Sequence, residues 1–135
     1  MTISFNELIK DKVLTDVSHT QQLNLERLRK ALNVVRAAYG KPMYVTSGLR
    51  TMQEHLRIYS AKGMTDRTKI PMQSAHLSGE AADFADPRQE LQKWCLENVA
   101  VLEQEGLYCE DFAATATWVH FQIRAPRSGN RFFKP

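Results

Sequence analysis

The sequence has few cysteines and no long apolar run. Only Cys95 and Cys109 occur among its 135 residues, and their spacing does not resemble a metal-binding pair. We therefore expect two free thiols in a reducing compartment rather than a disulfide framework. No stretch approaches the roughly 20 apolar residues of a membrane span. The N-terminus also lacks the basic start and apolar core of a signal peptide. These absences together predict a cytoplasmic protein with no membrane span.

The chain also lacks any block of like charge. Its formal net charge is +3, and no run of five Lys and Arg residues suggests a nucleic-acid footprint. We therefore expect no nucleic-acid partner, although the mild basicity leaves a nucleic-acid accessory role as a weak alternative. Hydrophobic residues make up 43% and charged residues 24%, which is ordinary for a globular protein. The length predicts one domain over residues 1–135 that can bury a core without disulfides.

The apolar pattern predicts long helices between short strands. Residues 20–39 have helical periodicity and stop at Gly40. A capping box formed by Thr51 and Glu54 starts a helix that runs to about residue 61. Another helix is predicted from Asp86, as N-cap, and Pro87 to near Gly106.

Short strands are predicted at residues 43–46, 80–84, 107–109 and 117–124. We read residues 62–74 as a loop and residues 1–19 as a segment that docks through Phe5, Leu8, Ile9, Val13 and Leu14. The tail, residues 125–135, should fold back because it contains Phe132 and Phe133. The expected fold is α+β: a small, mainly antiparallel sheet with helices packed against it and a metal site in a groove on the sheet.

The candidate metal ligands are His76, Asp83 and His120. His76 and Asp83 lie seven residues apart, with Gly79 between them, and Asp83 belongs to an apolar strand. A carboxylate buried there is costly unless it is paired or bound to a metal. Two imidazoles and one carboxylate form a usual catalytic zinc set with a fourth position left for water. Iron oxygenases use a similar triad, and a lone histidine in an apolar strand is often only a core residue.

Three segments of the chain together resemble a known family. Residues 74–83 read S-x-H-x-x-G-x-A-x-D, a W-x-H follows at 118–120, and residues 45–51 read VTSGLRT. This order is similar to that of the zinc D-Ala-D-Ala carboxypeptidase and L-alanyl-D-glutamate peptidase family, which includes bacteriophage endolysins. The resemblance covers about residues 43–123. It implies that the metal is zinc and that the partner is a peptidoglycan stem peptide.

The resemblance also implies roles for two residues outside the metal set. Arg50 matches the family's arginine, whose fork of donors suits a substrate carboxylate or a developing oxyanion. A structural salt bridge is the alternative for Arg50. Ser74 is expected to contact substrate while shaping the turn with Ser78, since no histidine at a defined spacing suggests a serine triad. We expect His19 and His55 at the surface, and Trp118 behind the sheet or lining the groove.

The general base is where the chain departs from the family. The resemblance places an Asp or Glu three residues before the last histidine, where this chain has Thr117. The nearest upstream acids are Glu110 and Asp111, and we favour Glu110. Both could instead be solvated loop acids.

The leading hypothesis is therefore a monomeric zinc peptidase of bacteriophage lysis, which reaches the cell wall after release from the host cytoplasm. The alternative is a catalytically impaired zinc domain of the same fold that serves as a wall-binding or virion module, as Thr117 would favour. The cleaved bond stays open among L-Ala-D-Glu, D-Ala-D-Ala and cross-bridge bonds.

Overall fold

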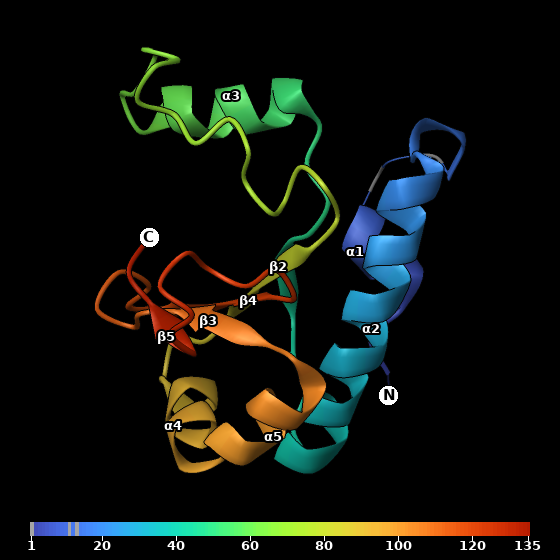
Figure 1. Cartoon of the computed structure of the whole chain (residues 1–135), viewed down its shortest axis with the longest axis vertical. Helices are drawn as coiled ribbons and strands as arrows, with labels where there is room; N and C mark the ends of the chain where they lie inside the picture. The colour runs from blue at the N-terminus through green and yellow to red at the C-terminus, as the bar shows by residue number, and fades with distance from the viewer. Residues whose placement is uncertain (1, 11, 13) are drawn as a thin grey trace.

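The chain forms an α+β fold around one mixed sheet (Figure 1). The computed structural model describes residues 2–10, 12 and 14–135. The helices are α1 (Phe5–Ile9), the 3-10 turn η1 (Leu14–Asp16), α2 (His19–Tyr39), α3 (Met52–Ala61), α4 (Glu90–Glu97) and α5 (Val99–Glu105). The strands are β1 (Val45–Ser47), β2 (Ala81–Ala85), β3 (Tyr108–Glu110), β4 (Trp118–Gln122) and β5 (Phe132–Phe133).

The five strands lie in the order β1-β2-β4-β3-β5. All neighbouring pairs are antiparallel except β3 and β5, which run parallel. The prediction of a mainly antiparallel sheet is therefore confirmed. The C-terminal tail folds back as predicted, because Phe132 and Phe133 form the edge strand beside β3. Helix α3 lies on the opposite side of the sheet from α4 and α5 (Figure 1). No helix in the described part of the chain is long and apolar enough to cross a membrane.

Two of the predicted helices begin and end where local capping chemistry places them. Helix α2 begins after Ser18, which forms a capping box with Gln21, and it ends at Gly40 in the left-handed conformation. Helix α3 begins after Thr51, whose hydroxyl accepts the N–H of Glu54. Both predictions are confirmed.

The third predicted helix is wrong at its start and in its length. Helix α4 begins at Glu90, after Gln89 at φ 59°, and not at Pro87. The Asp86 carboxylate still caps this helix, although it precedes the first helical residue. It accepts hydrogen bonds from the N–H groups of Leu91 and Gln92 at 3.0 and 2.8 Å. An extra turn at residues 86–89 therefore fits between the capping residue and the helix. The helix then breaks at Asn98, and α5 continues to Gly106.

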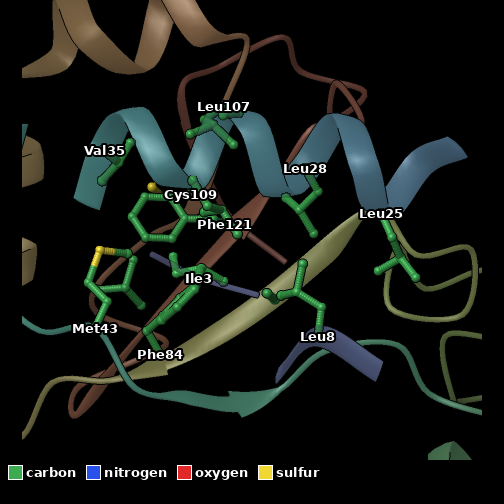
Figure 2. Close-up of a cluster of buried hydrophobic side chains, with 14 of the residues drawn as sticks. Ile3, Leu8, Leu25, Leu28, Val35, Met43, Phe84, Leu107, Cys109 and Phe121 are labelled. Carbon is green, nitrogen blue, oxygen red and sulfur yellow. The ribbon is translucent and has the colours of Figure 1, made fainter. Parts of the chain in front are cut away.

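The core lies between α2 and one face of the sheet (Figure 2). Helix α2 contributes Leu25, Leu28 and Val35, and the sheet contributes Phe84, Cys109 and Phe121. The free thiols Cys95 and Cys109 are both buried in this core. Side chains alternate between the faces of a strand, so Asp83, His120 and Glu110 are on the opposite face from these apolar residues.

The N-terminal segment docks on this core, as predicted for Leu8 and Ile9, which are both buried. Val13 and the side chain of Leu14 lie outside the described residues. The carbonyl oxygen of Leu8 accepts the N–H of Leu49 at 2.8 Å, so α1 is bonded directly to the segment after β1. This contact connects the N-terminus to the residues that build the site.

Candidate metal centre

The three predicted ligands come together on the polar face of the sheet. Asp83 in β2 and His120 in β4 are register partners, and His76 lies in the turn that precedes β2. His120 Nδ1 is 2.8 Å from Asp83 Oδ1, and His76 Nε2 is 3.3 Å from the same oxygen. One ligand atom from each residue lies within 4.8 Å of the others. The group therefore has the size needed to hold one metal ion.

The other nitrogen of each imidazole contacts an oxygen. His76 Nδ1 is 2.9 Å from the carbonyl oxygen of Gly48, and His120 Nε2 is 2.7 Å from Gln122 Oε1. A metal-binding histidine usually donates its second N–H to such an oxygen, which fixes the ring and its tautomer. His76 Nε2 and His120 Nδ1 are then the nitrogens that face Asp83. Once these two nitrogens release the protons that they share with Asp83, two neutral imidazoles and one carboxylate fit a tetrahedral zinc site.

The electrostatics of the site keep Asp83 ionised. Burial by itself would raise the pKa of Asp83, but hydrogen bonds from His120 and His76 outweigh it and hold the pKa well below its usual range. Burial would likewise lower the pKa of His120, yet the hydrogen bond with Asp83 raises it. The carboxylate is thus an anion across the physiological range, which is the form that binds a cation.

Arg50 lies beside the three residues, and its contacts do not use all of its N–H donors. Its Nε donates to Ser47 Oγ at 3.0 Å, and its Nη2 is 3.5 Å from Asp83 Oδ2. The ion pair with Asp83 that we considered from the sequence is therefore present, but it is long. Its side chain is 13% exposed and lines a pocket next to the ligands. Its Nη1 also contacts His55 Nδ1 at 3.5 Å, so the guanidinium has three side-chain partners, and its remaining N–H donors are available to a ligand in that pocket.

The prediction that His55 is a surface residue is wrong. Its side chain is fully buried, and Nε2 lies 2.7 Å from the carbonyl oxygen of Pro71. Burial lowers the pKa of His55, which favours a neutral ring that donates from Nε2. The loop after α3 covers this face of the helix, and the amphipathic pattern alone did not show that cover. His19 is exposed at the start of α2, as predicted.

A pocket of about 400 Å³ opens beside the ligands. Its lining consists of Arg50, Tyr59, Lys62, Pro71, Ser74, Ala75, His76, Asp83, Glu110, Ala114, Trp118, His120, Gln122 and Pro135. Trp118 thus lines the pocket, which was one of its two predicted positions. Ser74 also shapes the turn, because its hydroxyl accepts the N–H of His76 at 3.3 Å.

The two candidate bases differ in position. Glu110 is at the end of β3, lines this pocket and has Oε1 3.9 Å from His120 Nδ1. The Asp111 carboxylate instead accepts the N–H of Ala113 at 3.0 Å in the turn that follows. Thr117 lines a second, neighbouring pocket. The structure therefore brings Glu110 to the ligands and not Asp111.

Several residues that support the ligands were missed by sequence reasoning. Gln122 could have been found, because it lies two residues after His120 on the same face of a strand. Arg124 gave no signal in the sequence. Its guanidinium contacts Glu80 Oε1 at 2.8 Å, Ser78 Oγ at 2.9 Å and the carbonyl oxygen of Gln73. These three contacts lie on both sides of His76 and hold its turn against the end of β4.

Gly48 is a close-packed position, and we expect Gly48→Ala to disturb both folding and metal binding. An added Cβ would stand 2.1 Å from the Leu8 carbonyl oxygen, so the backbone of α1 or of residues 48–50 would have to move. We expect the free energy of unfolding to fall by about 3 kcal/mol, the upper end for overpacking. Affinity for added Zn²⁺ should fall as well if the three residues hold a metal, because the Gly48 carbonyl oxygen contacts His76 Nδ1 at 2.9 Å. Chemical denaturation and chelator competition measure the two effects.

The matched control is Gly40→Ala. Gly40 has φ +76° and nothing within 4 Å of the added Cβ, so this change costs backbone strain without a clash. We expect a loss of about 1 kcal/mol with unchanged zinc affinity. Equal zinc affinity in Gly48→Ala and the wild type would contradict the orienting role of Gly48.

Comparison with known proteins identifies a family and a solved structure of similar fold. Residues 2–122 match a family model described as Peptidase M15. The crystal structure of Serratia marcescens L-Ala D-Glu endopeptidase ChiX is similar, with a TM-score of 0.54 and 17% identity over 94% of this chain and 100% of that one. At this identity the likeness concerns the fold alone. None of the curated proteins is significantly similar to the chain in sequence.

Proposed function

The chain belongs to the M15 peptidase family, and from this premise we propose that it is a zinc-dependent peptidase that cleaves peptidoglycan stem peptides. The observation that most supports the proposal is the group of His76, Asp83 and His120, with ligand atoms within 4.8 Å of one another beside a pocket. ChiX, which has a similar fold, is an L-Ala D-Glu endopeptidase. The L-Ala-D-Glu bond is therefore the first bond to test. A setting in bacteriophage lysis is proposed on the resemblance to endolysins.

Zinc is the proposed metal, with His76 Nε2, Asp83 and His120 Nδ1 as its ligands. When bound, zinc would supply Lewis-acid activation of a water molecule and of the scissile carbonyl. The protein itself holds the three ligand side chains in position. Asp83 and His120 are fixed by their strands, and His76 is fixed by Gly48 and by the turn that Arg124 clamps.

Glu110 and Arg50 are the proposed reacting side chains. The peptide would lie in a groove over the polar face of the sheet, where both residues line the pocket. Glu110 accepts a proton from the attacking water as the oxygen–carbon bond forms, and it returns that proton to the leaving amine as the carbon–nitrogen bond breaks. Arg50 donates to the oxyanion that develops on the carbonyl, or to a substrate carboxylate.

We expect Arg50→Lys to fold normally and to turn over substrate more slowly. A point charge cannot reproduce a planar fork of donors, so the loss should be about 10- to 100-fold in kcat/KM, if one to two charge-assisted hydrogen bonds are lost. Thermal unfolding and steady-state kinetics separate the two effects. An unfolded Arg50→Lys protein would instead support a structural role for the contact with Asp83.

The proposed function is tested by digestion of purified peptidoglycan with and without a chelator. We expect soluble stem peptides in the untreated sample only, with activity restored by added zinc, and mass spectrometry of the products identifies the cleaved bond. Digestion that a chelator does not affect would overturn the zinc mechanism. Binding to peptidoglycan without any cleavage would support the second candidate, a wall-binding module. Thr117 favours that candidate, because it stands where the family resemblance implies an acid.

A further inference from the structure

A second pocket adjoins the metal pocket, and nothing in the proposed reaction uses it. Its lining consists of Thr46, Lys62, Asp83, Ala85, Thr117 and Trp118, and its volume is about 400 Å³. Lys62, Asp83 and Trp118 line both pockets. The two pockets are therefore neighbours that share a wall.

The cation of this pocket, Lys62, has no carboxylate partner among the described residues. Its ammonium lies 5.2 Å from the ring centroid of Tyr59, a contact that holds the side chain near the pocket without neutralising it. Asp83 is the acidic residue of the lining, but its carboxylate is already engaged by His120, His76 and Arg50. The charge of Lys62 is thus free to pair with a ligand.

Thr117 gives the same pocket its second distinctive feature. An acid at this position would place a carboxylate in the pocket that Lys62 lines, and the two charges would compensate each other. Threonine instead leaves the pocket with a hydroxyl, a second hydroxyl from Thr46 and an uncompensated cation. The Thr46 hydroxyl donates to the backbone carbonyl oxygen of Asp83 at 3.3 Å, which holds that exposed side chain beside Asp83 in the pocket lining.

We propose that the pocket of Thr46, Lys62, Thr117 and Trp118 is a subsite for a carboxylate-bearing residue of the substrate peptide, with Lys62 as the pairing cation. This inference rests on the proposed peptidase function. It assigns the exposed Thr117 to substrate selection, while Glu110 in the first pocket carries the proton. The enzyme would then prefer peptides with a free carboxylate beside the cleaved bond over the amidated forms.

The test uses two synthetic stem peptides that differ in one group, the free carboxylate of the glutamate, which the second peptide carries as a carboxamide. We expect the wild type to favour the carboxylate peptide about fivefold in kcat/KM, the value of one partly exposed ion pair. Lys62→Met should abolish the preference, and Lys62→Arg should keep it. Lys69→Met is the matched control, because Lys69 is an exposed cation of the same loop that lines neither pocket, and it should behave as the wild type. The preference should also shrink at high salt.

Binding measurements separate the subsite from the peptidase function. Calorimetry with zinc-loaded Glu110→Gln protein gives the affinity of each peptide without turnover, and Lys62→Met is introduced into that background. Tighter binding of the carboxylate peptide that Lys62→Met removes supports the subsite, even if the wild type cleaves neither peptide and the proposed function fails. Equal binding of both peptides, or a preference that survives Lys62→Met, overturns the subsite whatever the turnover. Thr117→Glu should lower affinity for the carboxylate peptide alone.

Discussion

His76→Ala is expected to abolish stoichiometric zinc binding and peptidase activity. The substitution removes one of three ligands, and the remaining pair, Asp83 and His120, cannot hold a tetrahedral ion as tightly. Outer contacts of a zinc site cost about 10- to 100-fold in affinity when they are removed, so a lost ligand should cost more than about 100-fold. Elemental analysis after dialysis measures the zinc content, and digestion of peptidoglycan measures the activity.

A matched control for this substitution is His19→Ala. His19 is exposed at the start of α2, away from the pocket lining, so the variant should retain zinc and activity. Circular dichroism and thermal unfolding establish that His76→Ala still folds. Stoichiometric zinc in a folded His76→Ala protein would show that the ligand set is wrong.

The candidate metal ligands could be chosen from the sequence because all three lie in segments whose order resembles that of a known family. His120 lies in a strand with clear apolar alternation, whereas Asp83 interrupts the apolar residues of β2. The pairing of β2 with β4 then places the two side chains opposite one another. His76 is close to β2 in the chain, so a tight turn through Gly79 is enough to bring it near. The expected order of helices and strands followed from the same local patterns.

One error arose where a distant segment decides the outcome, and another where two local arrangements fit the same residues. His55 lies on a helix face that is covered by Pro71. Pro71 belongs to the loop after the helix, and the periodicity of the helix does not indicate where that loop lies. The Asp86 carboxylate could cap a helix that starts at the next residue, or it could accept the N–H groups of residues five and six positions further on, as it does here. The sequence around Asp86 is compatible with both arrangements. Arg124 stabilises the turn that contains His76 by donating to Ser78, which lies 46 residues earlier in the chain. This contact forms only when the sheet has folded.

Glu110→Gln is expected to lower kcat about a hundred- to ten-thousand-fold while zinc remains bound. The amide cannot accept the proton of the attacking water, yet it has nearly the shape of the carboxylate, so the site should otherwise be intact. Glu110 lines the pocket of the ligands, with Oε1 3.9 Å from His120 Nδ1. Single-turnover kinetics with a stem peptide measures the chemical step, and elemental analysis checks the zinc.

Asp111→Asn is the matched control, since it makes the same chemical change at the next residue, whose carboxylate accepts the Ala113 N–H in a turn. We expect that variant to keep near wild-type activity. If Asp111→Asn loses activity and Glu110→Gln does not, the two roles are reversed; if neither loses it, the base is another group.

The double substitution Glu110→Gln with Thr117→Glu tests whether a carboxylate at position 117 can supply the base. We expect no rescue, because Thr117 lines the second pocket and a carboxylate there would face Lys62 instead of the attacking water. Recovered activity would show that position 117 can hold the general base, as the family resemblance implies. It would also remove the reason for assigning Thr117 to a substrate subsite.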